Sequence, residues 1–366
     1  MPFVAPRKIR RIAINTGGGD APGLNAVIRA VTLSANNRGW EVIGIKRGYS
    51  SLLGGDPCVV LSNTSVRGIA HLGGTILGTT NKGNPFETYI TFPGRRRRLA
   101  AEIIVEELQR LQVDGLIAVG GDGSLSIAHG LMQMGVPVIG VPKTIDNDLS
   151  GTDRTFGFDT AVSTATECLD KLHSTAQAHD RVMVVELMGR YAGWIALHAG
   201  LSSSCDVILI PEIPYDMKKV AAHLRKRKKG GRPYAIVVVA EGAVEAGGSL
   251  VFAEAKQQAR EQRLGGVAEY VAERIQKMTG QETRSLVLGH LQRGGSPTTN
   301  DRLLALRFGA AAVRLAEEGK WGHMVAYKPP TMSSVPIEEA IRTRKLVSVT
   351  SDTIMTVREL GVCLGD

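Results

Sequence analysis

Short apolar runs alternate along this chain with longer stretches in which apolar residues recur at helical spacing. Several of the runs end in a polar, glycine-containing turn, which is typical of strands in βαβ units and predicts mainly parallel sheets. Since open α/β sheets bind ligands beyond the carboxyl ends of their strands, these turns are expected to gather around the functional site. The predicted strands are residues 11–16, 41–46, 115–119, 136–141, 182–187, 206–210, 234–240 and 285–288.

The length of 366 residues exceeds that of a typical single domain and favours two lobes, each large enough to bury its own core. The expected fold is α/β, with two Rossmann-like lobes, mainly parallel sheets and the active site in the cleft between the lobes. A last helical stretch is expected at residues 343–360, packed on either lobe. Glycine is abundant, at 43 residues, and follows apolar runs, where it permits close approach of the backbone to a ligand.

The formal charge of +9 raises the question of nucleic-acid binding, because basic runs stand at residues 95–98 and 225–229. Only 5% of the residues are aromatic and neither run is interleaved with stacking side chains, so we expect no nucleic-acid partner. Solvated helix ends or loops are the simpler interpretation of both runs. A general attraction for phosphorylated anions is the alternative.

The four cysteines, Cys58, Cys168, Cys205 and Cys363, are far apart, have no spacing suited to zinc, and are expected to be reduced. No apolar stretch approaches the roughly 18 residues needed to cross a bilayer, and residues 1–11 hold no hydrophobic segment for secretion. We therefore expect a cytoplasmic protein with no membrane partner.

Two glycine turns carry candidate phosphate chemistry. In TGGGDAPGLNAVIRA, residues 16–30, amides bared by the glycines at 17–19 can hold a phosphate oxygen at the start of the next helix. A tight strand-to-helix turn without a ligand explains the same residues. In IAVGGDGS, residues 117–124, Asp122 can hold Mg²⁺ while flanking amides meet phosphates. Capping of the next helix by Asp122 or Ser124 is the alternative.

A third turn, PKTIDND at 142–148, places Lys143, Thr144, Asp146 and Asp148 within six residues. One acid can accept a hydroxyl proton while the other orients a metal or the lysine. Acids that only cap a turn are the alternative.

Taken in order, the segments GGGDAPGLNAVIRA, GGDGS, PKTIDND, MGRYAGW and LGHLQRGGSPTTNDR resemble the phosphofructokinase family, from about residue 10 to about residue 315. The resemblance implies phosphoryl transfer from ATP to the 1-hydroxyl of fructose 6-phosphate, which gives fructose 1,6-bisphosphate in glycolysis. It also implies a donor-binding lobe of residues 8–155 and 291–345, and a sugar-phosphate lobe of residues 156–290 and 346–366.

By the same resemblance, Asp146 accepts the hydroxyl proton and Thr144 places the sugar. The amide of Gly19 and the guanidinium of Arg190 stabilise the transferring phosphoryl group. These roles suit a reaction dominated by positioning and charge neutralisation.

Metal and ligand residues also follow from the resemblance. Asp122 is expected to hold Mg²⁺, and Asp148 to support the metal cluster. The expected nucleotide-binding residues are Gly19, Tyr49, Asn81, Lys82, Gly121, Asp122, Gly123 and Ser124. The expected sugar-phosphate residues are Thr144, Asp146, Arg181, Met188, Gly189, Arg190, Glu241, Arg284, His290 and Arg293. In this family the positions of Arg181 and Arg284 reach the sugar phosphate of a neighbouring subunit, so a homodimer or homotetramer with shared active sites is expected.

The sequence departs from bacterial ATP-dependent relatives at Asn81, where they carry an arginine; Lys82 beside it supplies charge without a bidentate fork. Relatives that use pyrophosphate usually have Asp at the position of Gly123 and Lys at that of Lys143, and many ATP users have Gly at both. We favour ATP, because an Asp next to Asp122 would crowd and repel a nucleotide α-phosphate. A pyrophosphate-dependent phosphotransferase is the alternative. A silent sugar-phosphate-binding regulatory subunit is a remote one, since the acids of both turns are present.

The effector site of allosteric relatives is only partly matched. Arg29 agrees, but Leu33 one turn later is apolar, and His173 near Lys171 stands where an arginine is expected. We therefore expect activation by ADP and inhibition by phosphoenolpyruvate to be weak or absent.

Overall fold

The computed structural model describes residues 8–91, 96–250 and 264–366. Residues 1–7, and residue 95 of the first basic run, lie outside the described part. The chain divides into two compact units. Unit 1 comprises Met1–Thr144, Leu149–Gly157 and Arg293–Arg344, and unit 2 comprises Ile145–Asp148, Phe158–Gln292 and Lys345–Asp366.

Unit 1 is built on a seven-stranded sheet. Its strands, in spatial order, are β13 (Thr331–Pro336), β12 (His323–Lys328), β7 (Val138–Pro142), β6 (Gly115–Gly120), β1 (Arg11–Thr16), β2 (Glu41–Ile45) and β3 (Val59–Leu61). The five inner strands are parallel to one another, and only the two edge strands are antiparallel to their neighbours. A separate two-stranded sheet pairs β4 (Tyr89–Ile90) with β5 (Arg98–Leu99).

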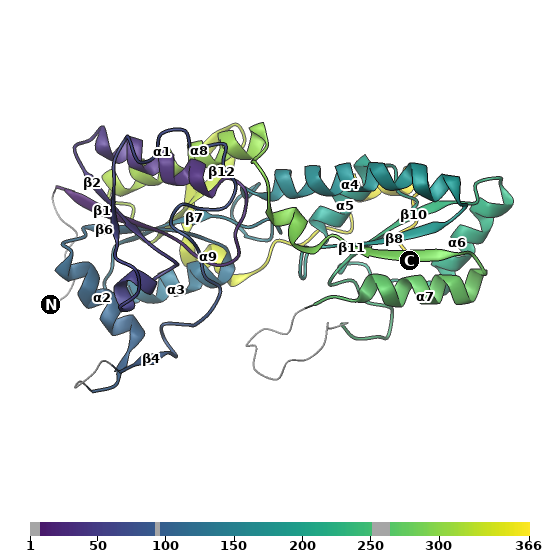
Figure 1. Ribbon diagram of the computed structural model, residues 1–366, viewed down its shortest axis with the longest axis horizontal. Coiled ribbons are helices and arrows are strands. Elements are labelled where there is room, and N and C mark those ends of the chain that lie inside the picture. Colours follow the sequence, from purple (N-terminus) through teal and green to yellow (C-terminus); the bar gives the residue numbers. More distant parts are fainter. Residues whose placement is uncertain (1–7, 92–95, 251–263) are drawn as a thin grey trace. The chain divides into compact units, whose positions relative to one another are not determined.

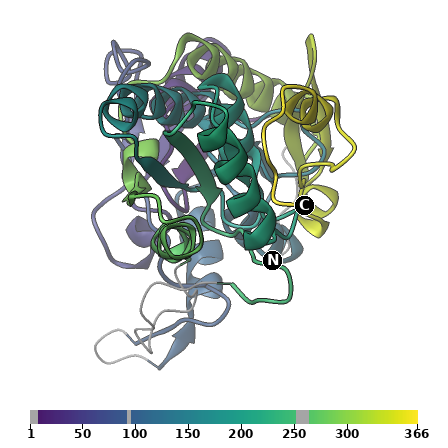
Figure 2. The same cartoon turned by 90° about the vertical axis from the view of Figure 1, so that its right-hand side faces the viewer.

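Helices cover both faces of the sheet of unit 1 (Figure 1, Figure 2). One face carries α1 (Leu24–Asn36) and α8 (Thr299–Glu317). The other face carries α2 (Ala100–Arg110), α3 (Asp122–Gln133), α9 (Ile337–Arg342) and the short 3-10 helix η1 (Ser50–Leu53).

The inner strands are apolar on both sides because both sides are covered by helices. In β1, Ile12 and Ile14 join the core cluster under α1 and α8, whereas Ala13 between them joins the cluster on the opposite face. All three side chains are fully buried. Such strands appear in the sequence as continuous apolar runs, which is why they could be predicted.

Unit 2 holds a four-stranded, fully parallel sheet in the order β11 (Thr283–Val287), β8 (Val182–Leu187), β10 (Ala235–Ala240) and β9 (Val207–Leu209). The helices of this unit are α4 (Phe158–Ala178), α5 (Trp194–Ser202), α6 (Met217–Lys229), α7 (Val267–Thr279), α10 (Asp352–Glu359) and most of the 3-10 helix η2 (Gly289–Arg293). Figure 1 shows α4 and α5 on one face of the sheet, and α6 and α7 on the other.

The α/β fold with mainly parallel sheets is confirmed. Every predicted strand coincides with an observed one, and no strand end differs by more than two residues. The prediction of a helix over 343–360 is wrong, because only Asp352–Glu359 is helical. The chain before it is tied to other segments instead: Lys345 N donates to Asp148 O at 2.8 Å, and Val347 N donates to the Glu212 carboxylate at 2.9 Å.

The four cysteines are free thiols. None of the helices in the described ranges has both the length and the apolar character that crossing a membrane requires.

Candidate active site

In unit 1, three of the predicted turns meet at the carboxyl ends of neighbouring strands. Gly17 N donates to Val119 O at 2.9 Å, and Lys143 N donates to Gly120 O at 3.0 Å. A Cβ at Gly17 would lie 2.7 Å from Ser124 Oγ and 3.2 Å from Ser124 Cβ, so glycine lets the first two turns approach this closely without displacing the serine side chain. Residues 17–20, 120–124 and 143–144 therefore form one strand-end cluster.

Side-chain donors hold the carbonyl groups of the first turn. Lys143 Nζ donates to Gly19 O, Arg293 Nη1 donates to Asp20 O at 3.1 Å, and Thr79 Oγ1 donates to Gly18 O at 2.6 Å. Within the described part of the chain, the amide of Gly19 donates to no protein acceptor. The turn thus presents an amide and two nearby cations, an arrangement that suits an anion.

Asp122 is the first residue of α3. The N-cap of this helix is Gly121, and no side-chain hydrogen bond caps it, so the alternative of capping by Asp122 or Ser124 is wrong. The described residues contain no group of three or more potential metal ligands. A single carboxylate such as that of Asp122, close to a glycine turn with an open amide, fits Mg²⁺, because this ion usually binds through one or two carboxylates together with substrate phosphates and water.

Gly123 follows with an exposed backbone. A Cβ at this position would meet nothing within 4 Å, and no positive φ requires glycine here. The fold of unit 1 therefore leaves the choice of residue 123 open.

The remaining donor-side candidates differ in exposure. Tyr49 is 9% exposed and packs in the core with residues of α2 and α3, and burial raises the pKa of its phenol. Asn81 and Lys82 are exposed, in a loop held to the first turn by the bond from Gly18 N to Thr80 O at 2.9 Å. The structure thus brings the loop to the strand-end cluster and places Tyr49 in the core of unit 1.

In unit 2, Glu241 holds the turn that follows β8. Its Oε1 accepts from Arg190 N at 2.9 Å and from Gly189 N at 3.3 Å. Burial raises the pKa of Glu241, and nearby Asp146 adds to that rise, while the bond from the Arg190 amide opposes it. Glu241, Asp146 and the turn of Met188, Gly189 and Arg190 therefore lie together.

This turn needs its glycine. Gly189 has φ +143°, and a Cβ there would lie 2.5 Å from Ala192 O. Arg190 itself has φ +50° and an exposed side chain. The glutamate thus fixes the backbone of the turn while the arginine side chain extends from it.

The last quoted segment, LGHLQRGGSPTTNDR, is divided between the two units after Gln292. His290 is exposed in η2, and Gln292 Oε1 accepts from Met188 N at 3.3 Å, so both belong with the turn after β8. Arg293 falls in unit 1, where it contacts Asp20.

Arg181 and Arg284 lie at the other end of the sheet of unit 2. Both bind the Glu282 carboxylate, at 2.9 Å and 2.6 Å, and both guanidiniums lower its pKa, that of Arg181 more strongly. Six-residue β8 separates this end from Glu241, which is about 20 Å at roughly 3.3 Å a residue. Within one chain, the structure therefore does not bring Arg181 and Arg284 to the other sugar-side residues.

The residues at the positions of the family's effector site contact other residues of their own unit. Arg29 Nη1 donates to Val66 O at 2.8 Å, and His173 Nε2 lies 2.7 Å from Ser203 O. Leu33 packs against the core under α1, and Lys171 pairs with Glu167 on the surface of α4.

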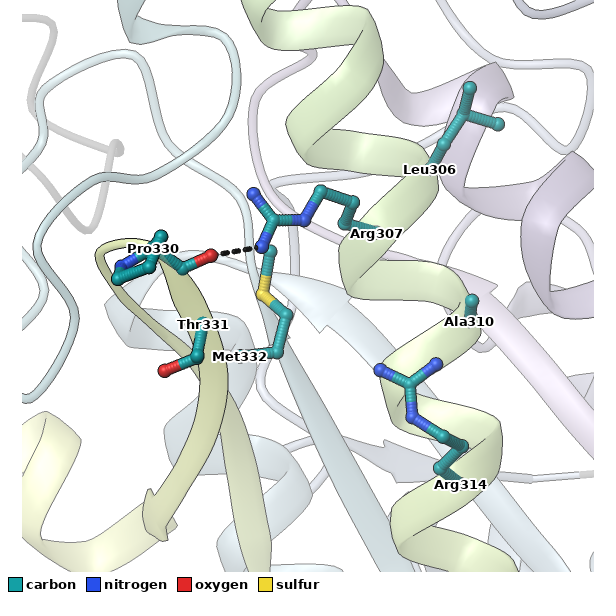
Figure 3. Close-up of a pocket in the computed structure, with 7 residues that line it drawn as sticks. All are labelled: Leu306, Arg307, Ala310, Arg314, Pro330, Thr331 and Met332. Carbon is teal, nitrogen blue, oxygen red and sulfur yellow. Dashed lines mark hydrogen bonds between the residues drawn. The ribbon is translucent and has the colours of Figure 1, made fainter.

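A groove of about 500 Å³ lies between α8 and the β12–β13 hairpin (Figure 3). None of the predicted site residues lines it. Its lining residues are Leu306, Arg307, Ala310, Arg314, Pro330, Thr331 and Met332.

Some residues that hold the turns were missed. Thr79 and Thr80 directly precede Asn81, and Trp194 ends the MGRYAGW segment, so nearness to a predicted site residue or motif was an available signal for these three. Lys345 and Glu212 lie outside the quoted segments, and only their contacts reveal them.

The fold and the strand-end cluster define an α/β protein of the class that binds phosphorylated ligands at the ends of parallel strands. The family model for phosphofructokinase matches residues 11–316. The chain belongs to the phosphofructokinase family, as the motifs indicated.

One relative, the ATP-dependent 6-phosphofructokinase of Chloroflexus aurantiacus, is 50% identical over 364 residues, covering 98% of this chain and 99% of the relative. Among solved structures, phosphofructokinase from Saccharomyces cerevisiae has a TM-score of 0.79 and 27% identity, covering 96% of this chain. This chain spans 47% of that longer yeast chain. The pyrophosphate-dependent phosphofructokinase from Marinobacter aquaeolei has a TM-score of 0.78 and 23% identity, covering 98% of this chain and 93% of its own, which shows the shared fold alone.

Proposed function

We propose that this protein transfers a phosphoryl group from ATP to the 1-hydroxyl of fructose 6-phosphate and so forms fructose 1,6-bisphosphate in glycolysis. The observation that carries the proposal is the 50% identity, across nearly the full length of both chains, with an ATP-dependent 6-phosphofructokinase. The ordered motifs and the strand-end turns support the same reaction. We expect the enzyme to work in the cytoplasm.

Unit 1 is the proposed donor lobe. The open amide of Gly19 and the cations Lys143 and Lys82 would bind donor phosphates, and Asn81 would contact them as a neutral group. Asp122 would hold Mg²⁺, which when bound neutralises phosphate charge as it develops on the transferring group. Tyr49 contributes packing beneath this region through its buried ring.

Unit 2 is the proposed sugar-phosphate lobe. Asp146 would accept the proton of the attacking hydroxyl, and Asp148 would support the metal and donor side. Glu241 orders the turn that carries Arg190, whose guanidinium would balance charge on the transferring phosphoryl group. Met188 and Gly189 would position the sugar, and His290 would bind its 6-phosphate. The same two roles are proposed for Thr144 and Arg293, respectively, which belong to unit 1.

ATP is the proposed donor because no protein atom fills the space beside Gly123. A Cβ at Gly123 meets nothing within 4 Å, so neither packing nor backbone geometry accounts for glycine there. Room for a nucleotide α-phosphate does account for it.

Pyrophosphate is the second candidate donor, and the residue that favours it is Lys143. The two donors are separated by initial rates with fructose 6-phosphate and Mg²⁺, compared as kcat/KM for ATP and for pyrophosphate. A preference for ATP by orders of magnitude supports the proposal. A preference for pyrophosphate would mean that Lys143 outweighs Gly123.

A homo-oligomer with shared active sites is part of the proposal. Measured along the strands at roughly 3.3 Å a residue, Arg181 is about 23 Å and Arg284 about 16 Å from the level of Glu241 in their own chain, so they would complete the site of a neighbouring subunit. Co-expression of Asp146→Ala and Arg284→Ala chains tests this arrangement. A hybrid oligomer regains one intact site if Arg284 acts across the interface, and regains none if it acts within its own chain.

A further inference from the structure

The C-terminal segment of unit 2 binds the backbone of the turn that carries Asp146. Lys345 Nζ donates to the side-chain oxygen of Asn147 at 3.0 Å. The amide of Lys345 donates to Asp148 O at 2.8 Å. One residue thus binds the two positions that directly follow Asp146, once through its side chain and once through its backbone.

Lys345 is itself held by α5 and the loop before it. Trp194 Nε1 donates to Lys345 O at 2.8 Å, and the ammonium group lies 5.6 Å from the centroid of a Trp194 ring. Two residues later, Val347 N donates to Glu212 Oε1 at 2.9 Å, and the same carboxylate accepts from Gly193 N at 3.0 Å. Segment 345–347 is therefore fixed at both ends to one platform.

The turn has a backbone that benefits from such support. Asn147 has φ +53°, in the left-handed region, which is uncommon for residues other than glycine although asparagine adopts it more often than most. Its side-chain oxygen is bound by Lys345, which holds the amide group in one orientation. Asp146 precedes it directly and is 5% exposed, so its direction depends on how this turn is held.

We infer that Lys345 is a positioning residue for Asp146, acting through Asn147 and Asp148 from a segment about 200 residues away. The inference rests on the proposed function, in which Asp146 is the base. A base displaced by a fraction of an ångström loses proton-transfer efficiency, and displacements of about 1 Å cost on the order of 100-fold in rate. Substrate binding depends on other groups and is expected to change little.

The test uses the full-length protein with Lys345→Met, Lys345→Arg and Trp194→Phe, and with Lys228→Met as a control on the exposed face of α6. Lys345→Met is expected to lower kcat by about 10-fold to 100-fold, with both KM values within about threefold of wild type. Lys345→Arg keeps a charged donor and recovers most of the rate. Trp194→Phe, which lacks only the ring N–H donor, shows a smaller loss of the same kind. The control keeps wild-type kinetics.

Thermal unfolding of each variant shows whether it is folded. A folded Lys345→Met protein with wild-type kcat overturns the inference, as does a loss confined to KM. If Lys345→Met does not fold, Trp194→Phe decides, and wild-type kcat in that variant overturns the inference. If wild type transfers phosphate from neither ATP nor pyrophosphate, the proposed function fails. Hydrogen exchange of residues 143–149 then tests whether Lys345 holds the turn of Asp146. If it does, the amides of these residues exchange faster in Lys345→Met than in wild type, and an unchanged exchange rate overturns the inference.

Discussion

The two units hold their strand-end turns in opposite ways. In unit 1, side-chain donors bind the carbonyl groups of the glycine turn: Lys143 at Gly19, and Thr79 at Gly18. In unit 2, glutamate carboxylates bind backbone amides instead; that of Glu186 is buried, and those of Glu241 and Glu212 are partly exposed. Each of these accepts at least two backbone N–H groups: Glu241, Glu212 and Glu186.

The difference shows what each unit offers a ligand. A turn whose carbonyls are occupied keeps amides for an anion, as at Gly19. A turn whose amides are occupied by a glutamate presents side chains, as at Arg190. For the proposed function we therefore expect unit 1 to recognise phosphates largely through its backbone, and unit 2 to recognise its ligand through arginine, histidine and aspartate side chains.

The largest effect is expected at Asp146, the side chain that we propose as the catalytic base. Asp146→Ala removes the proposed base and is expected to lower kcat by about 1,000-fold to 10,000-fold. Binding of fructose 6-phosphate, measured by calorimetry, is expected to change little. Asp146→Asn keeps the shape without the base and serves as the matched variant. Near-normal turnover in either variant would refute the assignment.

A second change tests backbone recognition in unit 1. Gly123→Asp adds a charge beside the nucleotide phosphates and is expected to lower kcat/KM for ATP by about 100-fold through repulsion and crowding. Gly123→Ala is the matched variant, because its Cβ meets no protein atom within 4 Å and adds bulk without charge, so any loss it shows reports crowding of the nucleotide alone. The measurement is the steady-state rate with each donor. An equal loss in both variants would contradict the role given to charge.

A smaller effect is expected on the pH dependence of stability, through the carboxylate of Glu241 in unit 2. The pKa of Glu241 is raised in the folded protein, chiefly by burial. Its contribution to stability is therefore fullest below the unfolded pKa near about 4.3 and is lost as pH rises through the folded value. Glu241→Gln keeps an acceptor for the amides but does not titrate.

The variant should consequently gain in unfolding free energy relative to wild type between pH 4 and pH 8, by about 1.4 kcal/mol for each unit by which the pKa is raised. Urea unfolding of both proteins across this range measures the difference. A difference that is independent of pH would mean that the charge of Glu241 is not penalised in the fold.

The smallest response is expected from effectors. Arg29 and His173 are engaged with carbonyl groups of their own units, and Leu33 is apolar. ADP and phosphoenolpyruvate at physiological concentrations are therefore expected to change the wild-type rate by less than about twofold, against the fivefold or more that is typical of allosteric coupling. A strong response to either ligand would show that other residues form the effector site.

Much of the fold could be predicted because the inner strands carry their own signal. Strand β8 was predicted to the residue, since its mainly apolar run is almost wholly buried, begins after Arg181 and ends just before Met188 and Gly189. The edge strands β3 and β13 were missed because they are partly exposed, and the two-residue strands β4 and β5 are too short to carry a pattern. The inner strand β12 was also missed, because its buried apolar run is only three residues long, between His323 and Tyr327. The helix expected after residue 343 failed because the backbone of 345–347 bonds to distant segments, and local spacing contains no trace of such partners.

The sequence by itself determined the family, the parallel α/β class and the identity of the turn residues. These features depend on local order: apolar runs, glycines after them, and acids at short spacing. The tertiary structure alone decided that Asp122 does not cap its helix, that Arg181 and Arg284 stand at the far end of the sheet from Glu241, and that Lys345 supports the turn of Asp146. These are relations between residues far apart in the chain, and only the packing of the folded backbone brings such residues together or keeps them apart.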